Sequence, residues 1–248
     1  MTITSKDNEK LKLVRRLADR KHREREGLFA VEGEDLLEAG RTAGFEPELV
    51  LSAVGAGLGG DEVEPGLLDA ASILGSGTRV ISVWSEHWAD PAGSLCVYLH
   101  GVGDPGNVGA VIRTAHALAD ATVVLGPGCA DPFSPKATRA TMGSIFGQPL
   151  ARAEVGETPA PRAALVAHGG SAPAGGPATI CLGAERAGVP DKVLAACDER
   201  WTIPLRPGGA ESLNVAAAAA ISIASLARGA RSDPGRISSP AVEGDPHA

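Results

Sequence analysis

Polar side chains that could bind a ligand occur in three separate segments, and each segment adjoins an apolar run. The segment nearest the C-terminus contains Ser212 and Asn214, directly before a run of alanines. Ser212 is a good helix N-cap, so we expect a helix to begin there and to point its free backbone N–H groups at whatever lies in front. The alternative is a capped core helix without a ligand, which this short motif alone favours.

Another segment follows the apolar run at Leu95–Leu99, which predicts a buried strand. A Pro-Gly turn comes next, and we expect Asn107 to cap a helix that carries Arg113 within its first two turns. Ligands of open α/β sheets bind at the carboxyl ends of strands, so both side chains could reach such a site. For Arg113 the alternative is that it only solvates the outer face of an amphipathic helix.

The remaining segment is the apolar run at Ile180–Leu182, followed by Gly183 and then by Glu185. This run also predicts a buried strand, with the carboxylate in the loop after it. A single Gly-x-Glu is weak evidence of a site, so the segment becomes informative only together with the other two.

In this order the three segments resemble the motifs of the SpoU-type (TrmH-like) RNA ribose 2′-O-methyltransferases. The first motif of that family is Asn-x-Gly-x-x-x-Arg, the second ends a strand with Gly-x-Glu, and the third joins Ile-Pro through a short loop to Ser-Leu-Asn-Val. The matching residues are Asn107, Gly109, Arg113, Gly183, Glu185, Ile203, Pro204, Ser212, Leu213, Asn214 and Val215. The resemblance covers roughly residues 95–228, and residues 133–140 are similar to the family's middle helix entry.

The resemblance implies a methyl-donor cofactor and a set of catalytic residues. The cofactor is S-adenosylmethionine, and Gly183, Ile203 and Leu213 would contact it mostly through backbone groups. Arg113 would activate a ribose 2′-hydroxyl. Because a guanidinium almost never loses its proton, Arg113 is either a base assisted by an RNA phosphate or a group that orients the hydroxyl and stabilises the oxyanion. The residues that would hold Arg113 and the ribose, or brace the site, are Asn107, Ser212, Asn214 and Glu185.

Strand and helix patterns alternate along the chain, which predicts an α/β protein with a mostly parallel sheet. We expect a small N-terminal α/β RNA-binding domain followed by a parallel-sheet α/β domain. The resemblance adds a C-terminal trefoil knot to the second domain, which topology rules alone do not favour. The expected divisions are an RNA-binding domain at residues 1–88, a linker at 89–94, a methyltransferase domain at 95–229 and a disordered tail at 230–248. Within the second domain we also expect a strand near Ile203 and a shortened helix within residues 156–176.

The N-terminal segment is strongly basic within an acidic protein. Residues 5–25 contain nine Lys and Arg against four Asp and Glu, whereas the whole chain has a net charge of −7. Leu11, Val14 and Leu17 form an apolar stripe, which predicts a basic amphipathic helix. A solvated helix face is the usual explanation of a charge run, but an RNA backbone is the natural partner of this local excess. The candidate RNA-binding residues are Arg15, Arg16, Arg20 and Lys21.

Composition excludes several classes of protein. The chain of 248 residues has no apolar run long enough to span a membrane and no signal-peptide core, which indicates a cytoplasmic protein. The four cysteines and six histidines show no metal-ligand spacing, so we expect no metal.

Three functions are compatible with these features. The leading hypothesis is an RNA 2′-O-methyltransferase that acts on ribosomal RNA. The alternatives are a transfer-RNA ribose methyltransferase and a catalytically idle RNA-binding or ribosome-assembly factor. Relatives form homodimers, and the helices after Asn107 and from Ser212 are the expected interface, because a helix that is apolar on nearly every face needs a second cover.

Overall fold

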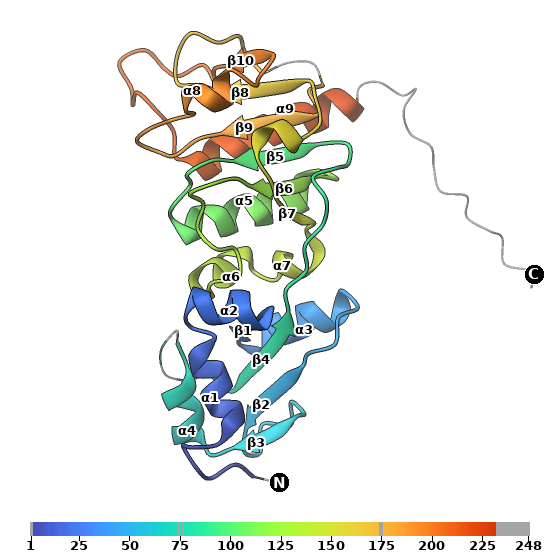
Figure 1. Ribbon diagram of the computed structural model, residues 1–248, viewed down its shortest axis with the longest axis vertical. Coiled ribbons are helices and arrows are strands. Elements are labelled where there is room, and N and C mark those ends of the chain that lie inside the picture. Colours follow the sequence, from blue (N-terminus) through green and yellow to red (C-terminus); the bar gives the residue numbers. More distant parts are fainter. Residues whose placement is uncertain (1, 74, 76, 174–175, 232–248) are drawn as a thin grey trace, which may run out of the picture.

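The computed structural model describes residues 2–73, 75, 77–173 and 176–231. Two α/β domains follow one another along the longest axis of the molecule, and residues 86–95 connect them (Figure 1). The N-terminal domain contains a four-stranded sheet with strand order β1-β4-β2-β3. Strand β4 is antiparallel to β1 and β2, and β3 is parallel to β2. Its elements are α1 (Glu9–Arg16), α2 (Arg20–Glu26), β1 (Leu28–Glu32), α3 (Glu34–Thr42), β2 (Leu49–Ala53), β3 (Asp61–Val63), α4 (Pro65–Ala71) and β4 (Val80–Ser85).

The basic segment forms two helices, where the sequence suggested one. Asp19 interrupts it because its carboxylate accepts a hydrogen bond from the N–H of Lys21 at 2.9 Å and so caps a new helix. The predicted apolar stripe is buried as expected, with Leu11, Val14 and Leu17 at most 1% exposed.

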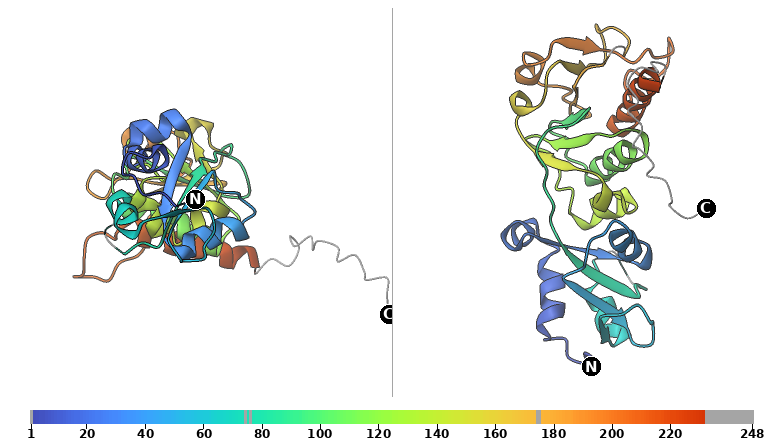
Figure 2. Two further views of the ribbon diagram at one scale, coloured as in Figure 1. Left: turned by 90° about the horizontal axis from the view of Figure 1, so that it is seen from below. Right: turned by 90° about the vertical axis from the view of Figure 1, so that its right-hand side faces the viewer.

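The second domain contains six parallel strands in the order β10-β8-β9-β5-β6-β7, which confirms the predicted parallel-sheet α/β domain. The trefoil knot stays a prediction. Helices α5 and α9 pack side by side on one side of the sheet (Figure 2, right view). The elements are β5 (Cys96–Leu99), α5 (Pro105–Leu118), β6 (Thr122–Leu125), α6 (Pro135–Thr141), α7 (Ser144–Gly147), β7 (Leu150–Arg152), the 3₁₀ turn η1 (Val155–Glu157), β8 (Arg162–Leu165), β9 (Thr179–Leu182), α8 (Asp191–Leu194), β10 (Glu199–Trp201) and α9 (Val215–Arg231).

The predicted strand at Ile203 is wrong by a few residues. Strand β10 ends at Trp201, which is fully buried, and Ile203 lies in the segment after it. Pro204 has no backbone N–H to donate, so it cannot extend the pairing with β8. No helix occupies the described residues between β8 and β9, and β10 completes that edge of the sheet. The expected tail lies outside the described residues apart from residues 230 and 231, which still belong to α9.

The two domains share one apolar interface. Phe29 of β1 lies 4.8 Å from Phe133 between ring centroids, and Trp84 of β4 lies 4.7 Å from Phe146. Gly40 allows this packing, because a Cβ there would overlap the Trp84 ring. All four aromatic side chains are at most 6% exposed, so the interface is a core and the domains are held in a fixed orientation.

Candidate active site

Three of the predicted site residues form one hydrogen-bonded cluster. Asn107 donates from Nδ2 to Oε1 of Glu185 at 2.7 Å. Asn214 donates from its own Nδ2 to the same oxygen at 2.8 Å and to Oδ1 of Asn107 at 3.0 Å. The loops after β5 and β9 and the start of α9 therefore meet at one point, as the carboxyl ends of neighbouring parallel strands allow.

Asn214, and not the predicted Ser212, caps α9. Its Oδ1 accepts from the N–H groups of Ala216 and Ala217 at 2.9 and 3.3 Å, and the helix begins at Val215. Ser and Asn are equally good caps, so local preference does not decide between them. Asn214 prevails because its amide nitrogen is held by Glu185 while its oxygen binds the helix.

Asp104, and not the predicted Asn107, caps α5. Its Oδ1 accepts from the N–H of Asn107 at 3.1 Å, and Pro105 takes the first helical position, where its missing N–H costs nothing. The side chain of Asn107 is thereby free to reach Glu185. Lys136 binds Oδ2 of Asp104 at 2.7 Å, and this contact, with the Asn107 N–H, lowers the pKa of Asp104 below its usual value.

A largely apolar pocket adjoins the cluster. Its lining includes the three predicted cofactor contacts, Gly183, Ile203 and Leu213, together with Ser212 and Glu185. A Cβ at Gly183 would overlap the backbone of Gly188, so this position must lack a side chain. Backbone groups and apolar side chains, rather than charges, therefore form most of the pocket.

The other residues that line the pocket come from the ends of β8 and β9, the segment after β10 and the start of α9. They are Leu165, Val166, Ala167, Leu182, Ala184, Gly188, Leu205, Glu211, Val215 and Ala218.

Arg113 is not part of the hydrogen-bonded cluster. It is exposed on α5, six residues after Asn107. Six residues of an α-helix correspond to a rise of about 9 Å and a rotation of about 240°, so the two side chains leave the helix in different directions. Within one chain, the structure brings together Asn107, Glu185 and Asn214 but leaves Arg113 apart from them.

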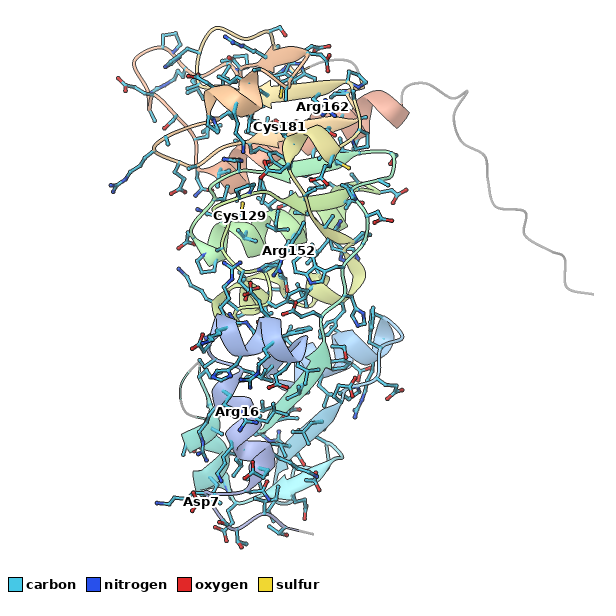
Figure 3. The ribbon with its side chains drawn as sticks, in the orientation of Figure 1. Asp7, Arg16, Cys129, Arg152, Arg162 and Cys181 are labelled. Atoms are coloured by element: carbon cyan, nitrogen blue, oxygen red, sulfur yellow. The ribbon has the colours of Figure 1, made fainter. Side chains whose placement is uncertain are left out.

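The four predicted RNA-binding residues lie on α1 and α2, and their surroundings differ. Arg15 is exposed and donates to the carbonyl oxygen of Lys6 at 2.8 Å, and Lys21 is exposed as well. Arg20 pairs with Glu24 at 2.9 Å, one turn along α2. Arg16, which Figure 3 labels, is half-buried, and its Nε has no hydrogen-bond partner.

Arg23 belongs to the same run of charges but has a structural role that the sequence did not indicate. Its side chain is 3% exposed and pairs with Asp131 of the second domain at 2.7 Å. It therefore cannot contribute to an RNA-binding face as the neighbouring cations can.

Within the described part of the chain, no group of His, Cys, Asp and Glu is arranged to hold a metal ion. Among the same residues, no helix is long and apolar enough to cross a membrane. The four cysteines are free thiols, of which Cys96 and Cys181 are buried.

Comparison with known proteins covers almost the whole chain. Residues 94–224 match the SpoU rRNA Methylase family, and residues 8–87 match the MRM3-like substrate binding domain. The 23S rRNA (guanosine(2553)-2'-O)-methyltransferase RlmP of Bacillus subtilis (strain 168) is 32% identical, over 88% of this chain and 96% of that protein.

Two solved structures share the fold over nearly their full length. The AdoMet-bound rRNA methyltransferase from Sinorhizobium meliloti has a TM-score of 0.81 and 26% identity, and covers 92% of this chain and 98% of its own. A putative RNA methyltransferase of the TrmH family from Porphyromonas gingivalis has a TM-score of 0.78 and 29% identity, with 91% and 99% covered. On the match to the family and to RlmP, this chain belongs to the SpoU rRNA methylase family.

Proposed function

We propose that this chain is an S-adenosylmethionine-dependent RNA 2′-O-ribose methyltransferase that acts on ribosomal RNA. The observation that carries the proposal is the cluster of Asn107, Glu185 and Asn214 beside a pocket that Glu185 lines together with Gly183 and Leu213. Family membership and the rRNA substrate named for RlmP support the reaction and the class of RNA.

The pocket fits the cofactor. Gly183 lines the pocket without a side chain, and the half-buried Ile203 and partly exposed Leu213 offer apolar surface. Backbone N–H and C=O groups can hold an adenine and an amino-acid group, as in many cofactor sites that are mostly apolar. When bound, S-adenosylmethionine supplies an activated methyl group.

The cluster would hold a ribose in position, so that its 2′-hydroxyl can attack the methyl group. Glu185 accepts from the amide nitrogens of both asparagines, which fixes the orientation of the two amide groups. The oxygen of Asn107 then accepts from Asn214, and the oxygen of Asn214 accepts from the N–H of Ala216. Asn214 is further fixed by α9, and Ser212 lines the adjoining pocket. We assign Arg113 to the hydroxyl, where its permanent positive charge orients the nucleophile and stabilises the developing oxyanion.

The position of Arg113 supports a homodimer. Because Arg113 lies apart from Asn107 and Asn214 within one chain, we propose that a second copy places its arginine at the site. Leu118 on α5 and Ile221 on α9 are 37% and 42% exposed, which leaves apolar surface on this helix pair for a partner. We expect light scattering at micromolar concentration to give twice the 25.1 kDa mass of one chain. An active species of single-chain mass would contradict the dimer.

Co-expressed inactive variants would reveal whether the site is shared. Chains with Arg113→Gln and chains with Asn107→Ala, carrying different tags, should form mixed dimers that methylate RNA, because one site then contains both native residues. If Arg113 acted within its own chain, every site in the mixed dimer would lack one residue and no activity would return.

In this proposal the N-terminal domain binds the RNA substrate. Arg15, Arg16, Arg20 and Lys21 contact the phosphate backbone, which a basic helical surface favours. We propose that the protein acts on this RNA in the cytoplasm.

Transfer of labelled methyl groups to purified RNA tests the function. We expect incorporation into unmodified 23S rRNA at a single ribose and none into transfer RNA. Methylation of transfer RNA alone would favour a transfer-RNA ribose methyltransferase. Folded protein that binds RNA but gives no heat with S-adenosylmethionine in calorimetry would favour an idle RNA-binding factor.

A further inference from the structure

A second cleft, of about 560 Å³, lies where the two domains meet. It is lined by Arg20 of α2, by residues 125–132 from the last residue of β6 onward, and by residues 152–154 at the end of β7. Arg152 and Cys129 are labelled in Figure 3, in the half of the second domain that is next to the N-terminal domain. None of these residues belongs to the pocket beside the catalytic cluster.

Two exposed guanidinium groups from different domains meet at this cleft. Nε of Arg20 lies 2.9 Å from Oε1 of Glu24, and Nη2 of Arg152 lies 3.8 Å from the same oxygen. The two arginine side chains are 53% and 42% exposed. One carboxylate cannot neutralise two guanidinium groups, so the group formed by Arg20, Arg152 and Glu24 keeps a formal positive charge beside the cleft.

The other carboxylates near the cleft are engaged. Asp131 is 5% exposed and is paired with Arg23 at 2.7 Å. Glu154 is paired with Lys192 at 3.0 Å. Glu86 accepts from Nε1 of Trp88 at 3.0 Å, and burial raises its pKa above the usual value.

The ring of Trp88 does not line the cleft itself, but it contacts Arg152, which does. The guanidinium carbon of Arg152 lies 4.1 Å from the ring centroid of Trp88, whose ring meets Phe133 edge-on at 5.2 Å. Trp88 is 36% exposed, whereas Trp84 and Trp201 are at most 1% exposed. An exposed tryptophan beside arginines is the combination on which unpaired bases stack in single-stranded RNA sites.

The cleft lies on the same edge of the sheet as the catalytic cluster. The cluster forms after β5 and β9, the cleft after β6 and β7, and the strand order is β9-β5-β6-β7. Adjacent strands are about 4.8 Å apart, so two to three strand spacings separate the sites by roughly 10–15 Å. A few nucleotides of one RNA strand span this distance.

We propose that the cleft binds the single-stranded RNA segment next to the target nucleotide. Arg20 and Arg152 contact its phosphates, and Trp88 stacks on a base. This inference rests on the proposed function and adds a binding site for the flanking RNA that is separate from the site of methyl transfer. The buried pair of Arg23 and Asp131 fixes one wall, so the cleft exists before RNA arrives.

Arg152→Gln tests the cleft by RNA binding. The probe is a 12-nucleotide single-stranded RNA of mixed sequence, measured by fluorescence anisotropy across a salt series. We expect affinity to fall about three- to tenfold, and the slope of log affinity against log salt to fall by about 0.7 for one lost phosphate contact. With 23S rRNA as substrate, KM should rise while kcat and the affinity for S-adenosylmethionine stay within about twofold.

Arg79→Gln is the matched control. Arg79 is 59% exposed and pairs with Glu34 at 2.9 Å, much as Arg20 pairs with Glu24, but it lies outside the cleft. This variant should bind the RNA as the native protein does. Equal losses in the two variants would mean a general charge effect and would overturn the proposal.

Tryptophan fluorescence gives a second measurement that needs no variant. Because Trp88 is the exposed tryptophan, acrylamide quenches it preferentially, and saturating RNA should protect it. Native affinity and salt slope in Arg152→Gln, or an unprotected Trp88, would exclude RNA from the cleft. A native protein that binds RNA in this way but never methylates 23S rRNA would contradict the proposed function and leave the cleft standing.

Discussion

Replacing Arg113 by Gln should lower the rate of methyl transfer about 10²- to 10³-fold, as loss of one group that stabilises an oxyanion does in other enzymes. Arg113 does not line the cofactor pocket, so the affinity for S-adenosylmethionine should stay within about threefold. Its side chain is exposed, so the free energy of unfolding should change by no more than about 0.5 kcal/mol. Single-turnover rates at saturating RNA and calorimetry with the cofactor measure these quantities.

Arg139→Gln is the control for this prediction, since it removes the same charge from an exposed position on the neighbouring helix α6. At saturating RNA the control should turn over at the native rate. Near-native turnover in Arg113→Gln would remove Arg113 from the mechanism. An intermediate rate in Arg113→Lys, which keeps the charge but loses the planar fork, would show how much the geometry of the guanidinium contributes.

From the sequence we predicted correctly which segments form the candidate site, but not which residues cap the helices there. Buried runs such as Leu95–Leu99 and Ile180–Leu182 became β5 and β9, because central strands of a parallel sheet are apolar throughout. The polar residues after them could be expected to meet, since such strands end at one edge. Asn107, Glu185 and Asn214 do meet there.

The helix caps could not be predicted in the same way. Asp104 and Asn107 are both good caps, as are Ser212 and Asn214, and local propensity does not separate them. The choice depends on Glu185, which is distant in sequence and binds the amides of both asparagines. A contact between distant residues decided a local feature.

The charge of Arg23 was misleading for a related reason. In the sequence it is one of nine cations in a basic segment, and nothing nearby marks it as different. Its partner, Asp131, is 108 residues away, and only the packing of one domain on the other brings them together. A single sequence does not contain that information in readable form.

Replacing Arg23 by Met should lower the free energy of unfolding by about 3–5 kcal/mol, because it leaves Asp131 buried without its ion-pair partner. Nε and Nη2 of Arg23 donate to one oxygen of Asp131 at 2.9 and 2.7 Å. Its Nη1 donates to the carbonyl oxygens of Leu17 and Ala18 at 2.7 and 2.8 Å. The arginine therefore joins the turn between α1 and α2 to the second domain. Urea unfolding followed by tryptophan fluorescence and by circular dichroism measures the loss.

Two further variants separate a buried ion pair from an ordinary charge effect. Lys12→Met removes an exposed partner of Glu9 and should cost less than about 1 kcal/mol, since surface pairs contribute little. The double variant Arg23→Met with Asp131→Leu should be more stable than Arg23→Met alone, because the uncompensated carboxylate is gone. If Arg23→Met costs no more than Lys12→Met, the pair does not hold the domains together. A double variant that is less stable than both single variants would place the effect in the lost packing of Arg23 and not in the unpaired charge.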